Sequence, residues 1–240
     1  MPIIGPTARL IEAGLLIAAG SAAAFAQDME PRRWTPLPVG ASIVTAGYVY
    51  TNGNIAFDPL LKVEAATLNT KTWAISILHA FEALGQLARL DAVLPWQHAR
   101  WKGLLNGEPR ELDRRGLADP LIRLSVNFLG PPALDAEPLR AYQAAHPVYT
   151  VAGAALAVTL PLGEYQRDKL LNLGQNRFVI RPQIGVVHRR GHWSCELTGS
   201  VFLFPDNTHF YPDQLRALNP LFALQGHLVF TATGRRSSEA

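Results

Sequence analysis

The sequence contains little cysteine, little charge and few long apolar stretches, and each shortage excludes a class of protein. Its 240 residues include a single cysteine, which excludes a disulfide framework and a metal site built from several cysteines. Charged residues make up 17% of the chain, whereas about a quarter is usual in a soluble domain. The net charge of +3 is small and no basic cluster follows a groove, so we expect no nucleic-acid partner.

A short apolar stretch near the N-terminus is typical of a signal peptide. Residues 13–26, AGLLIAAGSAAAFA, follow Arg9 and are rich in small side chains. The segment ends in Ala24-Phe25-Ala26, which fits the small-x-small cleavage pattern. We therefore predict export and a cleavable signal peptide at 1–26, with an uncleaved anchor as the alternative. After residue 26 no apolar run approaches the roughly 20 residues of a membrane-spanning helix, so a membrane crossing would use strands.

Alternation of apolar and polar residues recurs after residue 40 and predicts an all-β domain. Side chains alternate between the two faces of a strand, so each such segment predicts one apolar and one polar face. The clearest segment is DPLIRLSVNFL at 119–129. The eight segments are 41–51, 71–82, 88–101, 119–129, 148–162, 177–189, 192–204 and 221–233. Many reach ten residues, which is typical of transmembrane strands rather than of soluble ones.

The predicted connections differ between the two ends of the sheet. The links at 83–87 and 189–191 are short. The long, polar links are 52–70, 103–118, 163–176 and 205–220. If strands run alternately up and down, short and long links fall at opposite ends, as in outer-membrane barrels. One long link, 130–147, lies at the short-turn end, where DAEPLRAYQAAH predicts a brief helix.

We therefore predict an antiparallel up-and-down transmembrane β-barrel over 41–233. An extended, proline-rich leader at 27–40 precedes it, and a disordered tail at 234–240 follows. Because alternation does not say which face meets water, a soluble periplasmic β-barrel that binds a small apolar ligand is the alternative. In that alternative the apolar faces point inward.

Two residue types weigh on this choice. Aromatic side chains near strand ends favour the membrane, because tyrosine and tryptophan prefer the membrane–water interface. These residues are Tyr50, Trp73, Trp96, Trp101, Trp193 and Phe204. Prolines weigh against continuous strands, because proline donates no hydrogen bond to a neighbouring strand. They are Pro95, Pro161 and Pro182.

Several stretches together resemble the MetA-pathway phenol-degradation family of outer-membrane barrel proteins. The stretches are 32–59, 88–96, 116–134, 172–186 and 191–207. The most specific are GLADP at 116–120 and NLGQNR at 172–177. The resemblance implies a Gram-negative outer membrane, a channel-like barrel and passive passage of small hydrophobic or aromatic compounds. Family members look longer after the last predicted strand, so we expect about eight strands of a larger, C-terminally truncated barrel.

If the apolar faces meet lipid, the polar faces line a lumen. The predicted pore-lining residues are Glu82, Arg89, Asp91, Arg123, Ser125, Asn127, Arg181, Gln183, Glu196, Gln225 and His227. Two roles remain open for them: charged groups that tune selectivity, or ion pairs that fill and rigidify a narrow lumen. The expected partners are the lipid bilayer of the outer membrane and an unidentified small solute.

No catalytic or cofactor site is predicted. Ser76 and His79 are close in sequence, but three residues apart on a strand they face opposite sides. His188 and His192 flank a turn and lack a third metal ligand. A barrel enzyme acting on lipids and a non-functional fragment stay as further alternatives.

Overall fold

The computed structural model describes residues 32–55, 63–105, 107–210 and 214–231. The predicted signal peptide and the predicted C-terminal tail lie outside the described residues, as does the first part of the predicted leader. No helix in the described part of the chain is long and apolar enough to cross a membrane.

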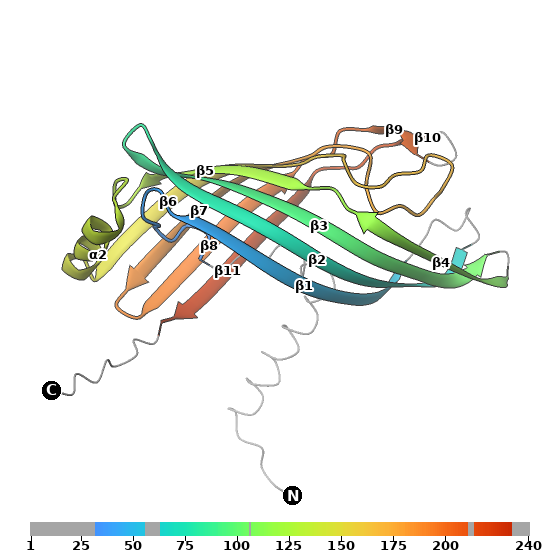
Figure 1. The fold of residues 1–240 in the computed structure, drawn as a ribbon, viewed down its shortest axis with the longest axis horizontal. Helices are drawn as coiled ribbons and strands as arrows, with labels where there is room; N and C mark the ends of the chain where they lie inside the picture. Colours follow the sequence, from blue (N-terminus) through green and yellow to red (C-terminus); the bar gives the residue numbers. More distant parts are fainter. Residues whose placement is uncertain (1–31, 56–62, 106, 211–213, 232–240) are drawn as a thin grey trace, which may run out of the picture. The chain divides into compact units, whose positions relative to one another are not determined.

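Nine strands form one antiparallel, curled sheet (Figure 1). Eight of them lie side by side in chain order: β1 (Ser42–Ile55), β2 (Val63–Ala83), β3 (Gln86–Leu105), β5 (Leu121–Leu129), β6 (Val148–Thr159), β7 (Val179–Arg190), β8 (Trp193–Phe202) and β11 (Leu221–Phe230). They correspond to the eight predicted segments, so the prediction of an up-and-down antiparallel β fold is confirmed. The long link predicted at 52–70 is wrong in part, because β1 extends to residue 55 and β2 begins at residue 63. A separate small hairpin contains β9 (Asn207–Phe210) and β10 (Gln214–Arg216).

The ninth strand, β4 (Glu108–Leu117), corrects the prediction of a long loop at 103–118. It forms a hairpin with the second half of β3, from the pair Trp96–Leu117 to the pair Leu105–Glu108. Both faces of β4 carry charged side chains, so the apolar periodicity used to find strands is absent there. Cross-strand ion pairs stabilise a sheet in place of apolar contacts, and this region has several of them.

Pro95 lies where β3 changes partners from β5 to β4. Its carbonyl accepts a hydrogen bond from the backbone N–H of Ala118, which lies between those two strands. The N–H and C=O of one residue in an antiparallel strand point to the same side. The N–H that proline lacks would therefore point to this break in the sheet, which explains why Pro95 is compatible with a long strand.

The short connections lie together at one end of the sheet, as predicted. Leu84 and Gly85 form a two-residue turn between β2 and β3, both with positive φ, and Gly191 turns between β7 and β8 with φ 58°. The predicted brief helix is confirmed as α2 (Ala136–Ala145), at the same end (Figure 1). The irregular segments at 160–178 and 203–206 lie at the opposite end, beside β4.

Burial in this sheet is the reverse of that in a soluble protein. Apolar side chains are exposed, including Leu124 at 48% and Leu224 at 72%. Charged side chains on the other face are buried, including Arg123 at 4% and Glu196 at 2%. The two faces thus alternate as the sequence predicts, and the polar one is the enclosed, inner face of the sheet.

Candidate functional site

The leader enters the inner face of the sheet through Arg33 and Trp34, which are both buried. The Trp34 indole Nε1 donates a hydrogen bond to Thr198 Oγ1 at 2.8 Å. The side-chain amide of Asn127 donates to the Trp34 carbonyl at 3.3 Å. These bonds tie the leader to β8 and β5, two strands from different parts of the chain.

Two glycines on the inner face make room for the Trp34 ring. Gly153 on β6 and Gly185 on β7 face each other in the strand register. A Cβ atom on either residue would overlap the indole. Glycine inside a strand often marks a close approach by another group, and here that group is Trp34. Tyr149, Val151, Ala155 and Val187 complete a small apolar cluster around this ring.

Buried charges surround the leader backbone. Arg33 Nη2 lies 3.1 Å from Asp91 Oδ2, and Arg123 Nε lies 3.3 Å from the same oxygen. Arg33 Nη2 also donates to Ser125 Oγ at 3.3 Å, and its backbone N–H donates to Glu196 Oε1 at 3.1 Å. Removing one member of a buried pair leaves an uncompensated charge, so this cluster holds the leader in one position.

Eight of the eleven predicted pore-lining residues are buried on the inner face. They are Arg89, Asp91, Arg123, Ser125, Asn127, Arg181, Gln183 and Glu196. Gln225 and His227 on β11 are half-buried, and His227 lies opposite Glu196 in the register. Glu82 lies near the turn after β2 and is exposed, because the end of the hairpin projects past the rest of the sheet.

The structure brings some of these residues into contact and keeps others apart. Asp91, Arg123 and Ser125 converge on Arg33, so here the predicted charges pair across strands. Arg181 instead lies over the Phe202 ring, 4.5 Å from its centroid. The guanidinium Nη2 of Arg89 has no hydrogen-bond partner among the described residues.

Sequence reasoning missed the contribution of the leader. Arg33, Trp34 and the hydroxyl of Thr198 were not among the predicted site residues. Two signals were available: a cation next to an aromatic residue in a polar leader, and glycines at inner-face positions of β6 and β7. Neither signal shows that the Trp34 ring packs against Gly153 and Gly185, because these glycines lie more than 100 residues after Trp34 in the sequence.

A second polar junction joins GLADP at 116–120 to the segment that contains NLGQNR at 172–177. Asp119 Oδ1 accepts a hydrogen bond from the Gly163 N–H at 2.8 Å, and Oδ2 accepts one from the Gln175 N–H at 2.7 Å. A Cβ on Gly163 or Gly174 would overlap atoms of Asp119. Burial raises the pKa of Asp119, while the two backbone hydrogen bonds act in the opposite direction. Asp119 therefore anchors the irregular segment to the end of the sheet.

Comparison with known proteins agrees with this architecture. The family model described as "Putative MetA-pathway of phenol degradation" matches residues 51–219. A solved structure, the COG4313 outer membrane channel from Pseudomonas putida F1, is similar with a TM-score of 0.60 and 21% sequence identity. The similarity covers 83% of this chain and 69% of that one, and at this identity it shows the fold. No curated protein matches the sequence.

Filling the space of Gly185 should destabilise the protein through Trp34. We expect Gly185→Val to lower the free energy of unfolding by about 1–3 kcal/mol, because the side chain overpacks against the indole. In the Trp34→Ala background the same change should cost less, with a coupling energy of about 0.5–3 kcal/mol in a double-mutant cycle. Urea-induced unfolding measures all four proteins.

Gly199→Val is the matched control, because a Cβ on this strand glycine meets nothing within 4 Å. It should change stability by no more than about 0.5 kcal/mol. An equal loss of stability at Gly185 and Gly199, or no coupling to Trp34, would contradict the packing described above.

Loss of the Asp119 carboxylate should release the 160–178 segment. Asp119→Ala leaves the backbone N–H groups of the half-buried Gly163 and the exposed Gln175 without their acceptor, and each lost hydrogen bond should cost about 0.5–1.5 kcal/mol. We expect faster tryptic cleavage after Arg167 and Lys169, measured by mass spectrometry of the native protein. Asp206→Ala, which removes an exposed carboxylate beside the same region, should leave the cleavage rate unchanged. Equal cleavage rates in the two variants would show that Asp119 is not the anchor.

Proposed function

Since the chain belongs to the family described as "Putative MetA-pathway of phenol degradation", we propose that it is an outer-membrane channel for passive uptake of small hydrophobic or aromatic compounds. The observation that carries the proposal is the reversed burial of the sheet. Leucine, isoleucine and tryptophan side chains cover its outer face, while arginine and carboxylate side chains are enclosed. An apolar outer face of this kind is stable in contact with lipid. Export through the predicted signal peptide would bring the chain to the outer membrane.

Aromatic rows at both ends of the outer face support this location. Tyr48, Trp73 and Trp96 form one row, with successive ring centroids 5.3 Å apart. Trp193 and Phe230 lie 5.0 Å apart near the short turns at the opposite end. Two aromatic girdles on either side of an apolar band are typical of outer-membrane barrels. Trp101, predicted from sequence as an interface residue, is instead buried on the inner face.

The soluble alternative fits the structure less well. A soluble barrel with a bound apolar ligand would place Leu124, Ile184 and Leu224 inside, yet all three are exposed. A barrel surface with this many exposed apolar side chains is stable in lipid and prone to aggregation in water. The reversed burial therefore favours the membrane.

The inner face supports a small and partly apolar solute. Trp34, Tyr149, Val151 and Val187 form an apolar, aromatic layer inside the sheet, beside the buried ion pairs. The description of the family points to phenol-like molecules, which have one polar group on an aromatic ring. The sequence contains no nucleotide-binding motif, so we propose passage by diffusion rather than by coupled transport. A channel of this kind uses no catalytic residue, and we propose no enzyme activity.

A charge on the outer face should impair membrane insertion. Leu124→Arg places a cation on the apolar face of β5, where it should cost about 2–4 kcal/mol at the middle of a bilayer. We expect a lower folded fraction after refolding into lipid vesicles, measured by the difference in gel mobility with and without boiling. Leu84→Arg, at a fully exposed turn position, should fold as the wild type does. Equal folding of the two variants would contradict the assignment of the outer face to lipid.

Removal of the leader side chain inside the sheet should increase passage through the channel. Trp34→Ala takes away the largest fully buried side chain of the inner face. We expect a higher single-channel conductance in planar bilayers than for the wild type. Trp193→Ala, which removes an indole from the outer face, is the control and should leave conductance unchanged. The same conductance for Trp34→Ala and the wild type would show that this residue does not restrict the lumen.

A further inference from the structure

Beyond the first aromatic row, the outer face of β1–β4 becomes polar and basic. The strand registers place its side chains in rows across the four strands. The aromatic row of Tyr48, Trp73 and Trp96 continues to Leu117 on β4, and the row after it is Tyr50, Lys71, His98 and Arg115. The third row contains Asn52, Asn69, Arg100 and Asp113, and the fourth contains Lys102 and Glu111. We call the three polar rows the outer basic surface.

This surface carries more positive than negative charge. Lys71, Arg100, Lys102 and Arg115 contribute four cations, and Asp113 and Glu111 contribute two anions, which leaves a net charge of +2 with histidine neutral. The acidic side chains occupy only the third and fourth rows. In the row next to the aromatic side chains, which is nearest to the proposed membrane, the only charged side chains are the cations Lys71 and Arg115.

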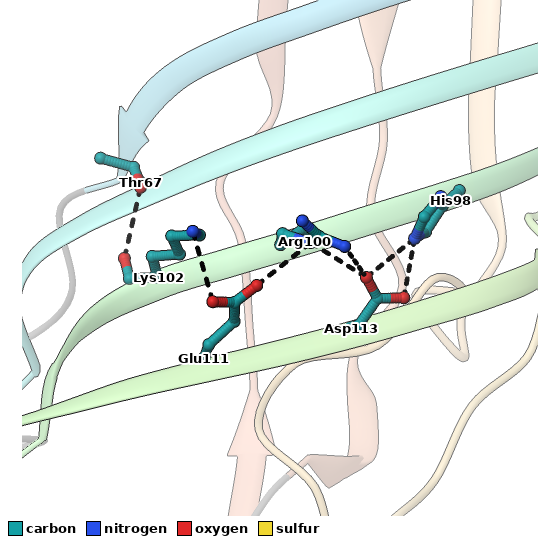
Figure 2. A network of polar contacts seen from close by, with 6 residues as sticks. All are labelled: Thr67, His98, Arg100, Lys102, Glu111 and Asp113. Carbon is teal, nitrogen blue, oxygen red and sulfur yellow. Dashed lines mark hydrogen bonds and ion pairs between the residues drawn. The ribbon is translucent and has the colours of Figure 1, made fainter.

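Existing contacts pair the charged side chains of the more distant rows with one another. Figure 2 shows Asp113 between His98 and Arg100, with Nε2 of His98 at 2.7 Å and Nη2 of Arg100 at 3.0 Å. Glu111 bridges Arg100 at 3.2 Å and Lys102 at 3.3 Å. The hydrogen bond with His98 lowers the pKa of Asp113, which favours the charged form of this carboxylate.

The two cations nearest to the aromatic row have no such partner. Within the described residues, neither Lys71 nor Arg115 has an ion pair or a hydrogen bond from its side chain, and both are exposed. Lys71 also lines a groove of about 500 Å³ together with Tyr50, Asn69, His98, Arg100 and Lys102. The surface therefore combines a recess with unpaired positive charge.

The apolar band continues directly from this groove. Trp73 is followed on β2 by Ile75 and Ile77, and Trp96 is preceded on β3 by Leu94, all exposed on the same face. A molecule bound here would meet cations first, then aromatic rings, then aliphatic side chains. That order matches an amphiphile with a phosphorylated sugar headgroup and acyl chains.

We propose that the outer basic surface binds a phosphorylated glycolipid of the surrounding outer leaflet. Lys71 and Arg115 would hold its phosphates, while Asn69 and the groove would contact the sugar. Its acyl chains would lie along Ile75, Ile77 and Leu94. The inference rests on the proposed outer-membrane location, in which the long segments beside β4 face the cell exterior.

The test measures binding of diphosphoryl lipid A to the full-length chain in detergent micelles. Each preparation is first checked for the heat-dependent change in gel mobility that reports a folded barrel. The variant Lys71→Ser/Arg115→Ser removes the two unpaired cations. The control Arg167→Ser/Lys169→Ser removes two exposed cations from the irregular segment, so its net charge is identical.

We expect the Lys71→Ser/Arg115→Ser variant to bind lipid A about 20- to 30-fold more weakly than the wild type, given the usual contribution of a basic residue at a charged membrane surface. The control should bind within about twofold of the wild type. Dephosphorylated lipid A should bind the wild type as weakly as lipid A binds the variant. Inorganic phosphate at millimolar concentration should not displace the lipid.

Equal binding by the variant and the control would overturn the proposal, as would equal binding of the phosphorylated and dephosphorylated lipids. Displacement by inorganic phosphate would identify a site for free anions instead. In each of these cases a normal heat-dependent mobility shift would leave the proposed channel function intact. A wild-type chain without that shift would overturn the proposed function and this inference together.

Discussion

The carboxylate of Asp91 is the contact on which the inner arrangement depends. One of its oxygens lies within ion-pair distance of Arg123 on a neighbouring strand and of Arg33 in the leader. Arg123 completes the pairing of β3 with β5, while Arg33 fastens the leader to both. Because all three groups are buried, loss of the carboxylate would leave two guanidiniums without their common partner. The backbone and side-chain bonds of Arg33 and Trp34 then extend this anchor to β8.

The period-two pattern was sufficient to predict eight of the nine strands of the sheet and the two faces of each. Arg123 between Ile122 and Leu124 is the simplest case, since the pattern states that the arginine and its neighbours point oppositely. It does not state which face is enclosed, and the prediction of that face came from strand length, the asymmetry of the loops and the aromatic residues near the strand ends. The other strands were found by their apolar periodicity. β4 is polar on both faces and lacks this periodicity, so it was missed.

The inner site was only half predictable. Asp91 and Ser125 could be assigned to it because they belong to strands with a clear polar face. Arg33 and Trp34 could not, since the leader has no periodicity and its partners Gly185 and Glu196 are more than 100 residues away. Contacts between the leader and distant strands depend on the curvature of the sheet, which cannot be predicted from the residue pattern of a single segment.

The glycine pair opposite Trp34 has a mechanical consequence. On both sides of Gly153 and Gly185, the inner-face positions of β6 and β7 carry side chains, including Val151 and Gln183. The indole therefore fits on the inner face only beside Gly153 and Gly185, where no side chain occupies its space. Displacement of the leader along the sheet would therefore require the indole to leave this recess first.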